Sequence, residues 1–258
     1  MRWRLGVVGF PIEHSLSPVL HEAGLHLAGL EGTSTRVALR QDETTRLAEL
    51  MRSSFDALSV TMPLKESALA LCDEVGSVAS RVGVVNSLLA RDGRLLGDST
   101  DGPGFVDALL WLFGVEPSGM DVLVLGAGGA ARSIVDALIE AGAASVEVGG
   151  RTRAHVERLA SRYDRVSSAR VGGHADLIVN TVPATTRGEF SSDPKASSTT
   201  ICVDIAYEPR TTPWLVGYSE MGCRCANGLA MLAFQAARQM RWWWDVEIDG
   251  ANLLESLS

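Results

Sequence analysis

Residues 121–151 read DVLVLGAGGAARSIVDALIEAGAASVEVGGR, and this stretch decides the fold. An apolar run leads directly into a glycine-rich turn, which an amphipathic helical segment and a second apolar run follow. The turn holds Gly126-x-Gly128-x-x-Ala131, the strand–turn–helix pattern of dinucleotide-binding domains. Gly126 permits the tight turn, Gly128 lets a diphosphate approach the backbone, and Ala131 permits close helix–strand packing. The stretch predicts a Rossmann-type domain whose turn binds the diphosphate through Gly126, Ala127, Gly128, Gly129 and Ala130.

The end of the second apolar run indicates which dinucleotide is bound. An NAD site places Asp or Glu there to hold the ribose hydroxyl. Here Gly149 and Gly150 lead instead to Arg151, Thr152 and Arg153. A guanidinium group can stack on adenine and bind a 2′-phosphate. Surface arginines at a helix start are the alternative, but the missing carboxylate favours NADP(H).

The rest of the chain alternates strands and helices around this stretch. Apolar runs at 4–10, 34–39 and 57–61 alternate with helical segments at 18–29 and 42–53, which predicts parallel strands. We expect Ser17 and Asp42 to cap these two helices, and Asp92-Gly93 to turn a hairpin within 86–99. Beyond the dinucleotide stretch, strand-like runs at 176–182 and 200–207 precede a long apolar helix at 228–244.

This order predicts an α/β protein of two lobes. The first is an α/β domain over 1–101 that the C-terminal helices at 229–258 complete, and the second is the dinucleotide-binding domain over 102–228. Within the last long helix, the run Trp242–Trp244 cannot share one helix face, so at least one tryptophan should be partly exposed. Burial against the first domain is the simpler interpretation of this run, and a partner surface is the alternative.

Composition excludes several classes of protein. The 258 residues carry a net charge of −8, which argues against nucleic acid as a partner. The chain shows no bilayer-spanning apolar run and no signal-peptide pattern. We expect the cysteines to be buried free thiols that form no metal site, which favours a soluble, cytoplasmic protein. They are Cys72, Cys202, Cys223 and Cys225.

Several polar residues outside the dinucleotide domain suggest a small-molecule site. Ser15 and Ser17 lie in the turn EHSLSP, and Lys65 follows VTMPL. Asn86 ends VVN and Asp101 lies within DSTDGPG. Each alone has a simpler interpretation, such as a helix cap, a turn residue or a solvated cation, but together they are less easily dismissed.

Taken in order, these motifs resemble the shikimate dehydrogenase family over essentially the whole chain. The resemblance rests on PIEHSLSP, VTMPLK, VVNS, DSTDGPG, GAGGAARS, GRT, NTVP, DIAYEPRTTP and GLAMLAFQA. It implies an N-terminal substrate lobe, a Rossmann lobe and an active-site cleft between them. It also implies NADPH-dependent reduction of 3-dehydroshikimate to shikimate, a step of chorismate and aromatic amino acid biosynthesis.

The resemblance also implies roles for individual residues. Lys65 and Asp101 would form the catalytic acid–base pair. The substrate carboxylate would be bound by Ser15, Ser17 and Tyr207, and the ring hydroxyls by Thr61, Asn86, Asp101 and Gln235. Further cofactor contacts would come from Asn180, Thr181 and Gly228.

The chain departs from the family pattern at three positions. Ser59, Ser99 and Gly150 stand where asparagine is common in the family. Ser59 and Ser99 leave Thr61, Lys65 and Asp101 unchanged, so they should bear on packing and affinity. Gly150 lies at the adenosine end of the expected cofactor site and weakens the NADP prediction slightly.

Two other functions remain as alternatives. One is an NAD-preferring quinate/shikimate dehydrogenase or an enzyme for an amino-substituted analogue. The other is a catalytically silent paralogue that senses nucleotide or metabolite, although a retired site need not keep both Lys65 and Asp101. The assembly is expected to be a monomer or a homodimer.

Overall fold

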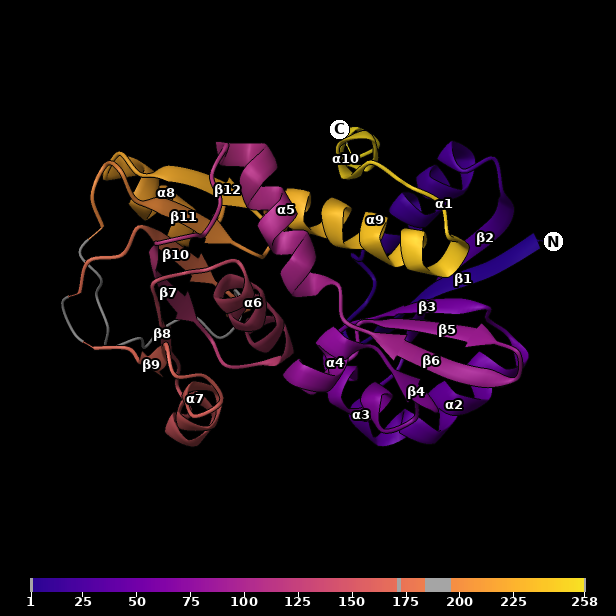
Figure 1. The fold of residues 1–258 in the computed structure, drawn as a ribbon. Helices are drawn as coiled ribbons and strands as arrows, with labels where there is room; N and C mark the ends of the chain where they lie inside the picture. Colours follow the sequence, from indigo (N-terminus) through magenta and orange to yellow (C-terminus); the bar gives the residue numbers. More distant parts are fainter. Residues whose placement is uncertain (1, 171–172, 184–195, 258) are drawn as a thin grey trace. The chain divides into compact units, whose positions relative to one another are not determined.

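The computed structural model describes residues 2–170, 173–183 and 196–257 (Figure 1). The chain divides into two compact units, and the chain crosses from one to the other within two helices. The first unit comprises Met1–Gly104 and Leu232–Ser258, and the second comprises Phe105–Met231.

The first unit is built on a mixed six-stranded sheet of order β2-β1-β3-β5-β6-β4. β1 pairs in parallel with β2 and β3, as the alternating N-terminal pattern predicts. β3, β5 and β6 are successively antiparallel, and β4 joins β6 in parallel. The strands are β1 (Arg2–Gly9), β2 (Glu31–Ala38), β3 (Ala57–Val60), β4 (Glu74–Val75), β5 (Ser87–Arg91) and β6 (Arg94–Asp98).

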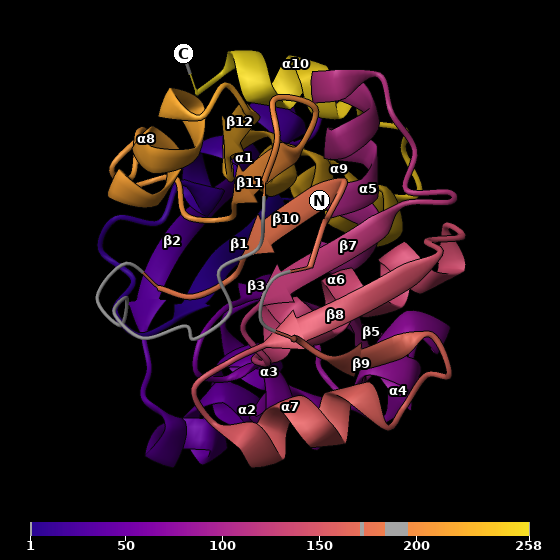
Figure 2. The same ribbon diagram turned by 90° about the vertical axis from the view of Figure 1, so that its left-hand side faces the viewer.

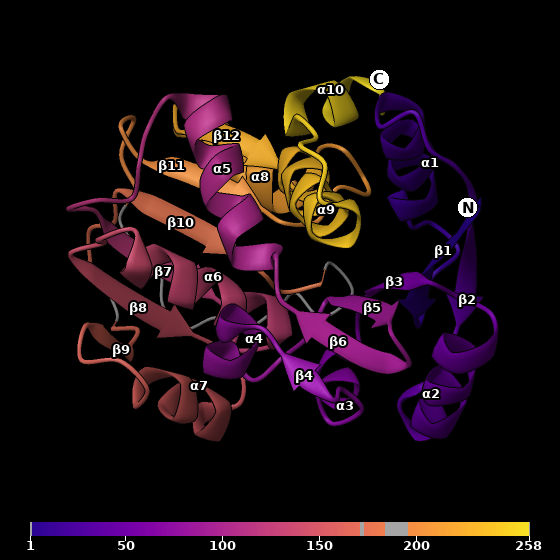
Figure 3. The same cartoon turned by 45° about the vertical axis from the view of Figure 1, so that its right-hand side comes forward.

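Helices cover both faces of this sheet. Val8, Leu58 and Leu88 pack on one face with side chains of α2, α3 and α4. Ala57 and Leu89 point to the other face, where α1, α9 and α10 pack (Figure 3). These helices are α1 (Ser17–Leu27), α2 (Thr44–Ser53), α3 (Lys65–Leu69), α4 (Ser77–Val82), α9 (Leu229–Trp244) and α10 (Gly250–Glu255). A further helix, α5 (Asp101–Phe113), begins in the first unit and continues into the second.

Of the local predictions at strand and helix ends, the hairpin is confirmed and the two helix caps are wrong. Asp92 and Gly93 both have positive φ, 52° and 74°, which forms the expected tight hairpin between β5 and β6. The cap predicted at Ser17 is wrong, because Ser17 is the first residue of α1 and its N–H donates to Ser15 Oγ. The cap predicted at Asp42 is also wrong. It lies in a 3₁₀ turn before α2, and Glu43 holds that turn through the Arg40 N–H.

The second unit contains an entirely parallel six-stranded sheet of order β12-β11-β10-β7-β8-β9 (Figure 2). This is the order of a doubly wound dinucleotide-binding fold, with its switch point between β7 and β10. α6 and α7 contact β7, β8 and β9, and α8 contacts β11 and β12. The elements are β7 (Asp121–Leu125), α6 (Gly129–Glu140), β8 (Ser145–Gly149), α7 (Arg153–Ala160), β9 (Val166–Ser168), β10 (Leu177–Asn180), β11 (Ile201–Asp204), α8 (Pro213–Glu220) and β12 (Arg224–Asn227).

The tryptophan run of α9 packs within the first unit. Trp243 is 1% exposed, and its ring meets His21 edge-on at 5.3 Å. Trp244 meets Trp3 in a similar geometry, and both Trp242 and Trp244 are partly exposed. This is the arrangement expected of three consecutive bulky residues on one helix. No helix in the described part of the chain is long and apolar enough to span a membrane.

His21 is a fully buried polar residue in this core. Its Nδ1 lies 2.7 Å from Ser34 Oγ and its Nε2 lies 2.9 Å from Ser59 Oγ. Burial lowers the pKa of His21 from 6.5 to about 3, because the surrounding core solvates the imidazolium poorly. The residue is therefore neutral in the folded protein throughout the physiological pH range.

We expect His21 to make the fold sensitive to acid. Between pH 6.5 and about 3 the unfolded chain binds a proton at His21 that the folded chain does not. The free energy of unfolding therefore decreases as the pH is lowered through this range. The loss is about 1.4 kcal/mol per pH unit, or roughly 2 kcal/mol at pH 5. Urea unfolding at pH 7 and pH 5 should show a smaller loss for His21→Asn than for the wild type.

The exposed His26 on the same helix provides the control. His26→Asn retains the buried imidazole and should retain the wild-type acid loss. Parallel stability–pH profiles for the wild type and His21→Asn would contradict the prediction, whatever the absolute stability of the variant.

Candidate active site

One edge of the first sheet collects most of the polar residues that the sequence singled out. Ser59 near the end of β3 pairs with Ser87 at the start of β5, which pairs with Asp98 at the end of β6. The residues that follow β3, precede β5 and follow β6 therefore meet at this edge. They are Thr61, Lys65, Asn86, Thr100 and Asp101.

Lys65 and Asp101 form a close ion pair at this edge. The Lys65 Nζ donates to Asp101 Oδ2 at 2.5 Å, and their side chains are 15% and 8% exposed. Lys65 begins α3 and Asp101 begins α5, so each is held by a helix start just beyond a strand. The pair is sheltered from solvent, where charge-assisted hydrogen bonds are strong.

Asn86 connects this pair to the loop before α5 and to α9. Its Nδ2 donates to Asp101 Oδ1 at 2.7 Å, so each carboxylate oxygen accepts a separate donor. Its Oδ1 accepts the Thr100 N–H at 2.8 Å, and its Nδ2 also lies 3.1 Å from Gln235 Oε1. The structure thus brings together four of the predicted residues. Thr100 was not predicted, although it directly precedes Asp101.

Gly104 permits the approach of α9 to this cluster. A Cβ atom there would lie 2.5 Å from the backbone N and Cα of Gln235. Only glycine allows the start of α5 to pass so close to α9. The second glycine of DSTDGPG is thereby explained by packing, since it lets Gln235 reach Asn86.

Thr61 and the two N-terminal serines offer hydroxyl groups in the same unit. Thr61 lies directly after β3, half-buried, and its hydroxyl has no hydrogen-bond partner among the described residues. Ser15 Oγ and Ser17 Oγ lie 3.3 Å apart, and Ser17 is 5% exposed. Arg36, which the sequence did not single out, donates from Nε to the Ser15 carbonyl at 2.8 Å.

The glycine-rich turn of the second unit has a geometry that only glycine permits. Gly126 has φ +113°, and a Cβ there would collide with Thr181 Oγ1. A Cβ at Gly128 would meet open space, and Gly128 caps α6 without a side-chain hydrogen bond. The first N–H groups of α6 are thus open to an anionic ligand, the arrangement that binds diphosphate groups.

Asn180 and Thr181 lie across the switch point from this turn. The Thr181 Oγ1 donates to the Leu125 carbonyl at 2.7 Å, which ties the end of β10 to the end of β7. Asn180 is 1% exposed, and its Oδ1 accepts the Val182 N–H. Its Nδ2 is buried and has no partner in the described part of the chain. An unpaired donor here fits a polar ligand between the two strand ends.

The two arginines after β8 differ in whether they already form an ion pair. Arg153 donates to Glu157 Oε1 at 2.6 Å on the surface of α7. Arg151 is exposed and has no ion-pair partner among the described residues. Thr152 is the N-cap of α7.

Gly228, before α9, passes so close to the Ile205 carbonyl that a Cβ would collide with it.

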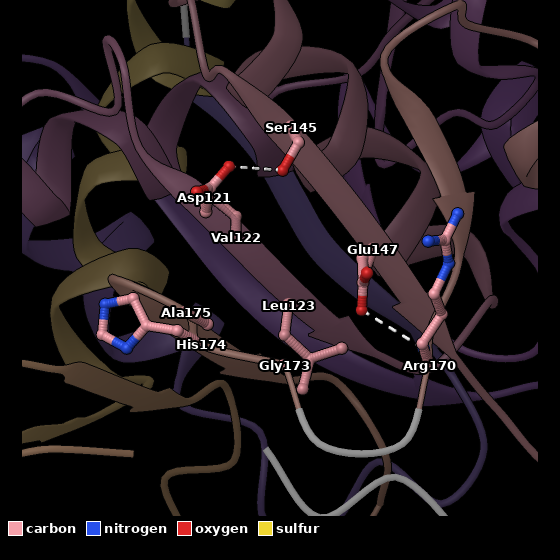
Figure 4. A pocket seen from close by; sticks show the side chains of 9 residues that line it. All are labelled: Asp121, Val122, Leu123, Ser145, Glu147, Arg170, Gly173, His174 and Ala175. Carbon is pink, nitrogen blue, oxygen red and sulfur yellow. Dashed lines mark hydrogen bonds between the residues drawn. The ribbon is translucent and has the colours of Figure 1, made fainter. Parts of the chain in front are cut away.

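One further predicted residue, and a recess that the sequence did not predict, belong to the second unit. Tyr207 follows β11 in the second unit. A recess at the amino ends of β7 and β8 is lined by Asp121, Ser145 and Glu147, but by none of the predicted site residues (Figure 4). It lies at the end of the sheet opposite to the glycine-rich turn.

Family models match most of the chain. Residues 7–88 match the shikimate dehydrogenase substrate binding domain, and residues 113–212 match shikimate / quinate 5-dehydrogenase. The NADP(+) shikimate dehydrogenase of Dinoroseobacter shibae is 38% identical over 93% of this chain and 91% of its own length. That of Thermus thermophilus is 37% identical, over 98% and 97% respectively.

Solved structures agree with this. Shikimate dehydrogenase from Aquifex aeolicus superposes with a TM-score of 0.87 at 29% identity, covering 98% of this chain and 96% of that one. The Thermus thermophilus enzyme in complex with NADP(H) and shikimate gives a TM-score of 0.84 at 35% identity, with 99% and 98% coverage. Both the predicted two-part α/β fold and the resemblance are confirmed, and the chain belongs to the shikimate dehydrogenase family.

Proposed function

We propose that this protein is an NADP-dependent shikimate dehydrogenase, which reversibly reduces 3-dehydroshikimate to shikimate. The sheltered contact between Lys65 and Asp101 carries the proposal, because it supplies an acid–base pair for ketone reduction. The comparisons confirm the predicted activity, its NADP cofactor and its place in aromatic amino acid biosynthesis. In the Thermus relative, NADP(H) and shikimate are bound together.

Lys65 acts as the general acid in the reducing direction. When a ketone is reduced, negative charge develops on its oxygen, and a cationic donor within hydrogen-bond reach lowers the barrier and delivers the proton. In the oxidising direction the neutral amine accepts that proton. Asp101 holds the Lys65 ammonium through Oδ2, while Oδ1 is fixed by Asn86. NADPH, when bound, supplies the hydride.

The substrate is bound mainly by groups of the first unit. The hydroxyls of Ser15 and Ser17, with Tyr207, bind the carboxylate, and no arginine clamp is needed. The ring hydroxyls are bound by a second set, of which Thr61 has an unengaged hydroxyl. This set is Thr61, Asn86, Asp101 and Gln235.

The cofactor is bound by the second unit. Residues 126–130 bind the diphosphate at the start of α6, supported by the open space at Gly128. Asn180, Thr181 and Gly228 border the nicotinamide end, supported by the unpaired Asn180 Nδ2. Arg151, with Thr152 and Arg153, binds the 2′-phosphate.

The cysteines support a reducing location. All four are free thiols, although Cys72 and Cys225 are only partly buried rather than buried as predicted. Burial raises the pKa of Cys72 to about 11, which leaves it protonated and unreactive at neutral pH. Free thiols are typical of proteins in the cytoplasm, where we place this enzyme.

The first test is reduction of the nicotinamide followed by absorbance. Purified protein should be given shikimate or quinate with NADP+ or NAD+, in all four combinations. We expect rapid reduction only with shikimate and NADP+. Activity with quinate or NAD+ instead would favour an NAD-preferring quinate/shikimate dehydrogenase. No reduction in any of the four mixtures would favour a sensing paralogue.

Replacing Lys65 should separate chemistry from binding. We expect Lys65→Ala to lower kcat by roughly 100- to 10,000-fold, the usual effect of losing a general acid, while the Kd for shikimate changes much less. Lys65→Arg is the matched control, because it keeps the charge beside Asp101 but cannot release a proton readily. It should also turn over slowly. Equal losses in kcat and binding would rule out the assigned role.

Replacing Arg151 should change the choice of cofactor. Arg151→Gln should raise the KM for NADP+ by roughly 10- to 100-fold, because a charge-assisted contact to the 2′-phosphate is lost. The KM for NAD+, which lacks that phosphate, should stay nearly constant. Arg153→Gln should have a smaller effect, because Arg153 is already paired with Glu157. Equal changes for both cofactors would contradict the prediction.

A further inference from the structure

The buried carboxamide of Gln239, on α9, lies directly beside Asn86 and the residues to which Asn86 is hydrogen-bonded. Gln239 is 1% exposed, and both the nitrogen and the oxygen of its carboxamide form hydrogen bonds. Its Nε2 donates to the Asn86 carbonyl at 2.9 Å, and its Oε1 accepts from Ser59 Oγ at 2.7 Å. It therefore joins α9 to the end of β3 and to the residue before β5, at the edge where Lys65 and Asp101 meet.

The direction of every hydrogen bond in this group follows from one fixed acceptor. The Asn86 carbonyl can only accept, so Gln239 must turn Nε2 toward it and Oε1 toward Ser59. Ser59 must then donate to Gln239, and it accepts from His21 Nε2–H. His21 Nδ1 is left as the acceptor of the Ser34 hydroxyl.

The Asn86 carbonyl already accepts the Val60 N–H at 2.8 Å, so Gln239 fills its second lone pair. The position of this peptide sets where the Asn86 side chain begins. That side chain in turn donates to Asp101 and accepts from Thr100. The amide of Gln239 is therefore one residue away from the groups proposed to bind and orient the reacting substrate.

Ser59 is also one of the positions that departs from the family pattern. Asparagine is common there, and in this chain the neighbouring carboxamide comes from Gln239 instead, across 180 residues of sequence. A serine hydroxyl and a glutamine amide together fill a site on the sheet edge that is closed to water, with Ser59 5% exposed.

We propose that Gln239 is a positioning residue, which holds Asn86, and through it the Asp101 carboxylate, in the geometry that the reaction requires. Ser59 fixes the orientation of Gln239. The inference rests on the proposed function only for its kinetic consequence, since the hydrogen bonds are properties of the fold. Displacements of about an ångström at a reacting centre can lower rates by as much as roughly 100-fold.

Gln239→Met tests this, because it keeps the length of the side chain and removes both hydrogen bonds. We expect kcat/KM with shikimate to fall roughly 10- to 100-fold in the wild-type background. In an Asn86→Ala background the same substitution should change kcat/KM by less than about twofold, because the residue to be positioned is gone. The double variant Ser59→Asn/Gln239→Met should recover part of the lost activity.

Met240→Leu is the matched control, since Met240 is the next residue of α9 and is fully buried in the apolar cluster of the first unit. It should lower stability without the kinetic loss. A Gln239→Met enzyme within twofold of the wild type, or equal losses in both Asn86 backgrounds, would overturn the proposal.

A second readout keeps this test separate from the proposed function. The side-chain amide resonances of Asn86 in a ¹⁵N spectrum should shift in Gln239→Met and not in Met240→Leu. If the wild type is inactive with shikimate, the proposed function fails, while the resonance shift still decides the positioning role. An unchanged Asn86 resonance would overturn that role.

Discussion

The Asp101 carboxylate is 8% exposed and accepts hydrogen bonds from Lys65 and Asn86, and the first unit is arranged to supply those donors. A carboxylate sheltered in this way is stable only when its charge is paired and its oxygens are hydrogen-bonded. The antiparallel order of β3, β5 and β6 meets this requirement, because it brings the end of one strand, the start of the next and the end of the third to a single edge. Gly104 completes the arrangement by admitting α9.

The second unit solves a different problem, that of holding a polar ligand with backbone groups. Its chain leaves β7 toward β8 and β9, and returns on the other side of β7 as β10. The divergence puts the carboxyl ends of β7 and β10 side by side at the switch point, where such folds form an opening for a ligand. Gly126 and Gly128 occupy one side of that opening and Asn180 the other, so the unpaired Asn180 amide is a consequence of topology as much as of residue choice.

How much of this could be predicted depends on the sequence distance between interacting residues. The dinucleotide turn and the Asp92-Gly93 hairpin are local, and both were predicted correctly. The short strands β4 and β9 were missed because two or three residues give no periodicity. The four residues of β12 were missed because they read RCAN, which is not an apolar run. The caps at Ser17 and Asp42 failed because the helices begin elsewhere: Ser17 is already the first residue of α1, and a 3₁₀ turn that contains Asp42 precedes α2. Gln239 gave no signal, since its partner Ser59 is 180 residues away.

Protonation of His21 lowers the stability of the fold, but it need not change the hydrogen bonds that lead to the site. In the neutral protein His21 donates to Ser59 through Nε2, and protonation would add its new proton at Nδ1, facing Ser34. The Ser34 hydroxyl can rotate to accept that proton, so the bonds from His21 through Ser59 and Gln239 to Asn86 keep their direction. The unfavourable energy of the imidazolium thus arises from its burial in the core rather than from a broken network. Acid should weaken the unit as a whole before it rearranges the residues around Asp101.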